Sequence, residues 1–147
     1  MIVVTDSGPL IHLAAVNQFR LLHQFFQLLL ITPQVHEEVI TQGAGRAGSL
    51  ELQQALQEKW ITVEEVADRA LIDRLTVPNI SKTDATVIAT ALVHHATLLL
   101  ADDIAVRTVA MREGRGGSGW LDRVGPFLSG AWRFADYAAG CRVVRLS

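Results

Sequence analysis

Short hydrophobic runs alternate along the chain with stripes of hydrophobic residues that recur at helical spacing. The runs predict buried strands at residues 2–4, 28–31, 60–66 and 97–101. The stripes predict helices at residues 10–14, 19–26, 33–42, 49–56, 67–75, 81–92 and 104–113. Elements that alternate in this order are typical of an open parallel α/β sheet that is covered by helices on both faces.

Composition is that of a folded globular chain. The 147 residues suit one domain, which we expect to span residues 1–147, and half of them are hydrophobic while 19% are charged. The N-terminal segment has no basic region and meets an acid at Asp6, so it does not resemble a signal peptide. The hydrophobic runs are far shorter than the roughly 20 residues that a membrane span needs. Cys141 is the only cysteine, which excludes an intrachain disulfide and favours a reducing cytoplasm.

The formal net charge of −2 gives no general attraction for nucleic acid, but the charge is unevenly distributed. Residues 1–103 contain 12 acidic and 6 basic side chains, whereas residues 104–147 contain 3 acidic and 7 basic ones. This asymmetry is a weak indication of a polyanionic partner, and an ordinary solvated surface explains it equally well.

Acidic residues follow the first and the last of the predicted strands. Asp6 comes after residues 2–4, and Asp102 and Asp103 come after residues 97–101. Because the carboxyl ends of parallel strands meet at one edge of a sheet, where ligands bind, these acids are expected to lie close together. A single aspartate at such a place is more often a turn residue or helix cap, but three at matching ends favour a shared site.

Helix geometry adds two further acids. Around the predicted helix 33–42, Glu38 lies about 60° from the inward-facing Val35, whereas Glu37 lies about 200° away and faces water. Asp84 lies about 40° from Ile88, which belongs to the buried stripe of its helix. Asp84 also stands three residues after Ser81, the spacing of a capping box, and a cap and a ligand are compatible roles there.

Several carboxylates in one place repel each other unless a cation joins them. A ligand set made only of oxygen points to Mg²⁺ or Mn²⁺ rather than Zn²⁺, and such sites usually serve phosphoryl transfer.

Other motifs in the sequence are weaker indications of function. The GxGxxG pattern at residues 43–48 follows a helix rather than a strand, and His36-Glu37 lacks the second histidine of a zinc protease motif. No partner can be identified for His12 or His23.

Four segments together resemble the acidic motifs of PIN-domain proteins, in order and in spacing: VVTDSGPLI, VHEEVI, SKTDATVIATAL and LLLADDIAVR. The resemblance covers roughly residues 1–113 and is closest to the bacterial and archaeal group that includes the toxins of toxin–antitoxin pairs. It implies a three-layer α/β/α fold with a small parallel sheet, Mg²⁺- or Mn²⁺-dependent cleavage of single-stranded RNA, and frequent homodimers.

The resemblance also assigns roles to residues. Asp6, Glu38 and Asp84 match the first three acids of the family, and the fourth is Asp102 or Asp103, with Asp103 favoured because the family's acid usually stands one residue deeper in the turn. The family commonly has Ser or Thr where this chain has Gly8. The region after residue 113 also departs from the family's usual ending, so that either the last strand is distorted or residues 141–146 supply it.

The leading hypothesis is therefore a cytoplasmic PIN-type endoribonuclease, a candidate toxin with an antitoxin protein as partner. Asp6, Asp84 and Asp103, with Asp102 beside it, would bind metal, and Glu38 would bind it directly or through water. Arg107 and Arg112 are weak candidates for contacts with RNA phosphates. The alternatives are a catalytically silent module that binds protein or RNA, and a different metal-dependent phosphatase or phospho-acceptor domain.

Overall fold

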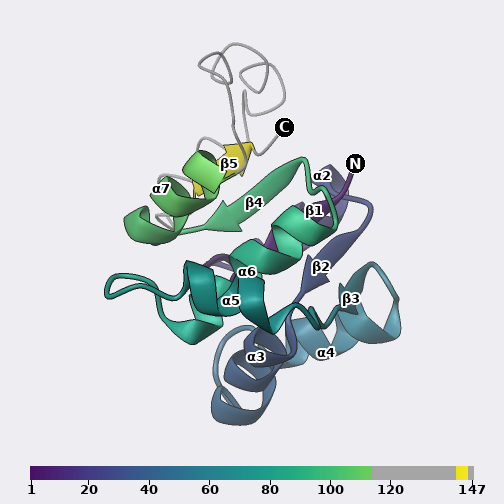
Figure 1. Ribbon diagram of the computed structural model, residues 1–147. Helices are drawn as coiled ribbons and strands as arrows, with labels where there is room; N and C mark the ends of the chain where they lie inside the picture. Colours follow the sequence, from purple (N-terminus) through teal and green to yellow (C-terminus); the bar gives the residue numbers. More distant parts are fainter. Residues whose placement is uncertain (114–141, 146–147) are drawn as a thin grey trace.

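The computed structural model describes residues 1–113 and 142–145, and within these residues the chain forms one mixed sheet with helices on both faces (Figure 1). The strands are β1 (Val3–Thr5), β2 (Leu29–Ile31), β3 (Ile61–Val63), β4 (Leu98–Ala101) and β5 (Arg142–Arg145). The helices are α1 (Ser7–Ala15), α2 (Arg20–Phe25), α3 (Pro33–His36), α4 (Ser49–Gln57), α5 (Arg69–Leu75), α6 (Lys82–Val93) and α7 (Ile104–Glu113). A π-helical segment, η1 (Glu37–Gln42), continues α3.

The strand order is β3-β2-β1-β4-β5. The first four strands are parallel, and β1 pairs with β4 so that Thr5 lies opposite Leu100. β5 pairs antiparallel with β4 and places Arg142 opposite Ala101. Residues 142–145 therefore supply an edge strand, which is one of the two endings expected from the sequence. Cys141 and the rest of the segment 114–141 lie outside the described residues.

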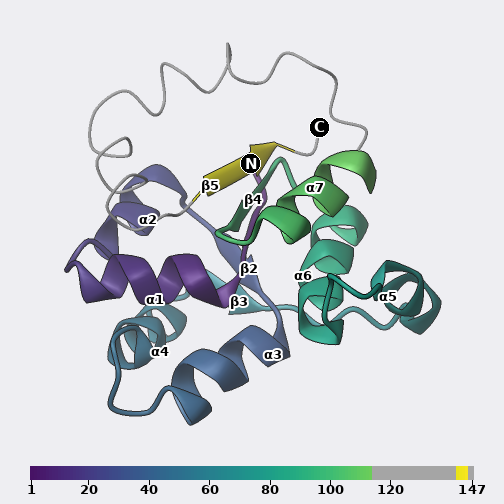
Figure 2. The same cartoon turned by 90° about the vertical axis from the view of Figure 1, so that its left-hand side faces the viewer.

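Helices cover the sheet in two layers (Figure 2). α1, α2 and α4 lie on one side of it, and α5, α6 and α7 lie on the other. β1 and β4 are buried between these layers, and their residues Val3, Val4, Leu99 and Leu100 are fully inaccessible to solvent. Strands covered on both faces are continuously hydrophobic, which explains the apolar runs in the sequence. The three-layer α/β/α fold is thereby confirmed.

Two predicted elements differ from those of the structure. The strand predicted at 60–66 is confined to Ile61–Val63, because its neighbour β2 ends at Ile31 and the last ladder hydrogen bond runs from Glu64 N to Ile31 O, 2.8 Å. The helix predicted at 33–42 changes from α to π geometry at Glu37. None of the helices in the described residues is long and apolar enough to cross a bilayer.

The carboxyl ends of the four parallel strands form one edge of the sheet. The residue that follows each strand comes, in spatial order from β3 to β4, as Glu64, Thr32, Asp6 and Asp102. Polar side chains therefore occupy every position of this edge, which is the place where open α/β sheets bind ligands.

Candidate functional site

Asp6 stands at the centre of this edge and is buried, with 7% of its surface exposed. Its backbone is extended and its N–H donates to Leu100 O, so the residue continues β1 and caps α1. The carboxylate oxygen Oδ1 accepts a hydrogen bond from Ser7 N at 2.8 Å, and Oδ2 has no hydrogen-bond partner among the described residues. A buried carboxylate with an unpartnered oxygen is unusual, because burial without compensation destabilises the charged form.

The surroundings of Asp6 shift its titration strongly. Burial, first of all, raises the pKa of Asp6 from an ordinary 3.8 to about 6, and the charges of Asp84, Asp102 and Glu38 raise it further, while the Ser7 N–H acts in the opposite direction. Three other acids are thus close enough to act on the Asp6 carboxylate. They come from η1, from α6 and from the end of β4, so the fold brings together acids that are far apart in the sequence.

Glu38 lies on η1 with its side chain partly buried, whereas Glu37 is exposed. Val35 and Val39 are buried on the inward side, as the helical geometry predicts, so Glu38 rather than Glu37 faces the edge. A Cβ atom at Gly43, where η1 ends, would lie 2.5 Å from Val39 O, so the tight closure of the π turn requires glycine. Single π turns in proteins are often associated with functional sites.

Asp84 forms the predicted capping box at the start of α6. Its Oδ2 accepts hydrogen bonds from Ser81 N at 3.1 Å and from Ser81 Oγ at 2.8 Å, and Ser81 Oγ accepts one from Asp84 N. Oδ1 has no hydrogen-bond partner within the residues that the structure describes. The cap of α6 therefore occupies one carboxylate oxygen of Asp84 and leaves the other for a further contact.

Asp102 and Asp103, the two alternatives for the fourth acid, differ in their surroundings. Asp103 is exposed, and its Oδ1 accepts hydrogen bonds from Ala105 N at 2.6 Å and Val106 N at 3.3 Å, so it caps α7. Asp102 follows β4 directly and is among the residues whose charge raises the pKa of Asp6. We therefore place Asp102, rather than Asp103, among the candidate acids around Asp6.

His12 and Gly8, both on α1, contact Asp102. The Nδ1 atom of His12 lies 3.5 Å from Asp102 Oδ2. A Cβ atom at Gly8 would lie 2.5 Å from Asp102 Cγ, so the absence of a side chain makes room for the carboxylate. Gly8 and His12 are four residues apart and share one helix face, a signal that was present in the sequence but that has no meaning until Asp102 is placed beside it.

Comparison with known families assigns the chain to a family. The model of the PIN-domain family matches residues 2–121. The chain belongs to the PIN-domain family. PIN domains are generally nucleases, so the family gives this chain a nuclease-type fold. No curated protein and no solved structure matches the sequence.

The donors of this PIN domain suit a hard divalent cation, since they are all carboxylates and Asp6 has a buried, unpartnered oxygen. Within residues 1–113 and 142–145, no three acidic or histidine side chains stand close enough to hold a metal as they are oriented. The reason is visible in their contacts: Asp84 turns toward Ser81 and Asp102 toward His12. Both side chains are partly exposed.

The two arginines proposed for RNA contacts differ in their surroundings. Arg112 forms an ion pair with Glu113 at 3.3 Å, and Glu113 is also bound by Arg74 at 2.8 Å. Arg107 forms no ion pair within the described part of the chain. Of the two, Arg107 is therefore the one whose guanidinium has no ionic partner there.

Proposed function

We propose that this PIN domain is a metal-dependent endoribonuclease that cleaves single-stranded RNA. The observation that carries the proposal is Asp6, a buried carboxylate whose pKa rises to about 6 through burial and the nearby charges of Asp84, Asp102 and Glu38. Such an arrangement is unfavourable for the fold alone, and perturbed acids at the carboxyl edge of a parallel sheet are typical of functional sites.

Each acid has a part in the proposed reaction. Asp6, Asp84 and Asp102 would hold Mg²⁺ or Mn²⁺, and Glu38 would hold it directly or through water. A bound divalent cation supplies an activated water and stabilises the charge on the phosphate and leaving oxygens. Asp6 provides a fixed anchor because β1 and the Ser7 N–H hold it, while Asp84 and Asp102 would have to turn from Ser81 and His12 to join it. Arg107 would orient a neighbouring phosphate.

The resemblance to the toxin group of the family supports three further proposals. The protein would be the toxin of a toxin–antitoxin pair in the cytoplasm, it would bind an antitoxin protein, and it would form a homodimer. The second candidate function, a silent interaction module, is favoured by one observation, namely that the acids as oriented form no ready three-ligand group within the described residues.

A cleavage assay separates the two functions. Purified protein is incubated with an end-labelled, unstructured RNA and with DNA of the same sequence, in Mg²⁺, in Mn²⁺ or in chelator. We expect cleavage of RNA that chelator abolishes. Asp6→Asn should abolish this cleavage, and Asp68→Asn is its matched control. Asp68 also caps a helix, since its carboxylate accepts a hydrogen bond from Leu71 N at 2.9 Å, but it is exposed at the start of α5. Protein that binds metal in a thermal-shift experiment and cuts no RNA would favour the silent module.

A further inference from the structure

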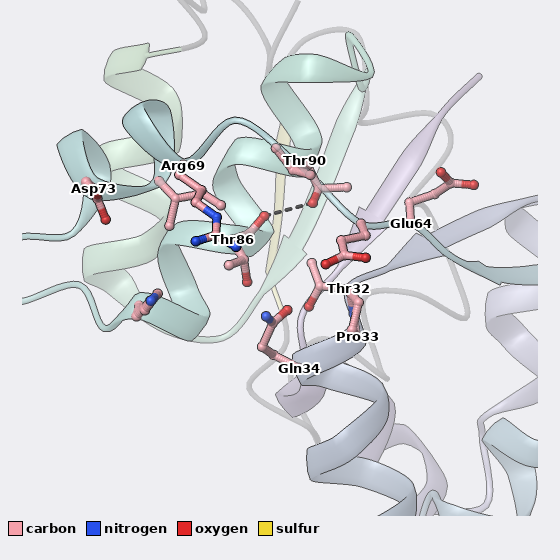
Figure 3. A pocket seen from close by; sticks show the side chains of 12 residues that line it. Thr32, Pro33, Gln34, Glu64, Arg69, Asp73, Thr86 and Thr90 are labelled. Atoms are coloured by element: carbon pink, nitrogen blue, oxygen red, sulfur yellow. Dashed lines mark hydrogen bonds between the residues drawn. The ribbon is translucent and has the colours of Figure 1, made fainter.

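A second site lies on the same edge of the sheet, beside the ends of β2 and β3. It is a cavity of about 360 Å³ between the start of α3, the segment after β3, and the helices α5 and α6 (Figure 3). This volume falls within the range of roughly 300–1,000 Å³ that is usual for small-ligand pockets. Neither the proposed reaction at the acids near Asp6 nor the resemblance to the family gives this cavity a role.

Three buried threonines form the floor of this cavity, and all three are satisfied locally. Thr32 Oγ1 accepts from Val35 N at 3.2 Å, Thr86 Oγ1 donates to Thr83 O at 2.6 Å, and Thr90 Oγ1 donates to Thr86 O at 2.8 Å. The floor is therefore fixed by the helices themselves. This surface is therefore preformed, and binding of a ligand would not have to order the threonine side chains.

The rim, in contrast, carries two cationic side chains without ionic partners among the described residues. Arg69 and Lys82 line the cavity and form no ion pair in the part of the chain that the structure describes. In Figure 3 the side chain of Arg69 reaches from α5 toward Thr86, and Gln34 directs its amide toward the same space from α3. Val66 and Ile72 add apolar surface. Donors, acceptors and apolar surface thus face one space.

The charges of the lining show which ligand chemistry suits it. Three carboxylates, Glu64, Glu65 and Asp73, stand against the two cations, so an isolated phosphate would be repelled. A nucleobase is neutral and carries both donors and acceptors on its edge, and an unstacked base is commonly held on an arginine plane and by polar groups at its edge. A carboxylate such as Glu64 accepts from an exocyclic amino group, which adenine, cytosine and guanine have and uracil lacks.

The cavity adjoins a smaller one that reaches toward the acids. This smaller cavity, of about 260 Å³, shares Pro33 and Gln34 with it and is also lined by Glu37, Glu38 and Thr83, the residue before Asp84. We propose that the larger cavity holds one unstacked base of the RNA strand, a few nucleotides from the phosphodiester that the acids act on, and that it selects a base with an exocyclic amino group. This inference rests on the proposed function and specifies its substrate.

Binding without cleavage tests the inference. Short unpaired RNAs with a single abasic nucleotide at each position in turn are titrated against the wild-type protein in chelator, and their affinity is measured by fluorescence anisotropy. We expect one position at which loss of the base weakens binding by about tenfold, and at which uracil binds more weakly than the other bases. Arg69→Gln should remove the sensitivity at that position only. Arg46→Gln, at an exposed arginine in the loop before α4, is the matched control.

Each outcome supports the inference or overturns it. Equal affinity for all abasic RNAs, equal effects of Arg69→Gln and Arg46→Gln, or no RNA binding at all would overturn it. Binding of free nucleoside monophosphates that Arg69→Gln abolishes, without a sensitive position in RNA, would assign the cavity to free nucleotides and overturn it as well. RNA that is cut with no sensitive position contradicts the inference alone. A sensitive position in RNA that is never cut contradicts the proposed nuclease and leaves the base site supported.

Discussion

At the β1–β4 end of the sheet edge, a buried carboxylate has one hydrogen bond and three acids nearby, whereas at the β2–β3 end three buried hydroxyls each have a local partner. Both ends begin helices directly after a strand, Asp6 at α1 and Thr32 at α3. The difference is that Thr32 caps its helix with an uncharged hydroxyl. Asp6 caps its helix with a carboxylate whose charged form is destabilised by burial and by repulsion from the nearby acids. Substitutions at the two ends should therefore change stability in opposite directions.

The largest effect is expected for Asp6→Asn. Cleavage and metal binding should be lost. The free energy of unfolding of the metal-free protein should rise by up to about 3 kcal/mol at pH 7, because the variant lacks the carboxyl whose pKa is raised in the folded state. Because the folded-state pKa is raised, the contribution of Asp6 is most favourable below about pH 4 and is lost as pH rises through about 6. Urea unfolding of both proteins at pH 4 and pH 7.5 measures this difference. Equal stabilities at pH 7.5 would contradict the electrostatic account of the site.

Replacement of each adjacent aspartate by asparagine tests which one belongs to the acidic end. Asp102→Asn should weaken metal binding at least about tenfold, because it removes a ligand charge beside Asp6. Asp103→Asn should leave metal binding unchanged and change stability by less than about 0.5 kcal/mol, because asparagine caps a helix as well as aspartate does. Isothermal titration with Mn²⁺ gives both affinities. The reverse ranking would restore Asp103 as the fourth acid.

Gly8→Ala is expected to act on function and not on stability. The new Cβ would displace the Asp102 carboxylate, which has 30% of its side chain exposed and can turn to solvent. Metal affinity should fall about 10- to 100-fold, and the unfolding free energy should stay equal or rise slightly because alanine suits a helix. Gly45→Ala is the opposite control: it has open space but a φ of +77°, so it should cost about 1 kcal/mol without changing metal affinity.

The smallest effect is expected at the other end of the edge. Thr32→Ala removes the cap of α3 and should destabilise the fold by about 1 kcal/mol, with no change in metal affinity. Thr32→Ser keeps the oxygen and should retain most of the stability. Thermal or urea unfolding of the pair measures the cap alone. A Thr32→Ala protein that is more stable than wild type would erase the contrast between the two ends.

Much of this arrangement follows from the sequence, and the exceptions have physical reasons. The apolar runs at 2–4 and 97–101 predict the two central strands, and the phase of Val35 and Val39 predicts that Glu38 faces inward, even though the helix becomes π-helical there. The strand pattern also places the end of β4 correctly at Ala101. The preference for Asp103 over Asp102 rests on the family's usual spacing, and the contacts that distinguish the two aspartates here are with His12 on α1 and with the backbone of α7.

The contact between His12 and Asp102 could not be predicted from the sequence, for a different reason. It joins residues from α1 and from the end of β4, and no local pattern encodes a contact between elements so far apart in the chain. The same is true of the cavity at the β2–β3 end, whose lining comes from α3, the segment after β3, α5 and α6. Tertiary packing alone brings these side chains together.

The strand order has a consequence for synthesis of the protein. β1 lies between β2 and β4, and Asp6 and Asp102 belong to segments made at opposite ends of residues 1–113. At translation rates of about 5–20 residues per second, roughly 5–20 s separate the two aspartates on the ribosome. During this interval β1 lacks one of its two neighbours, and the incomplete chain has only part of the acidic set. Under the proposed function, an unfinished chain is therefore expected to be inert toward RNA, including the messenger from which it is being translated.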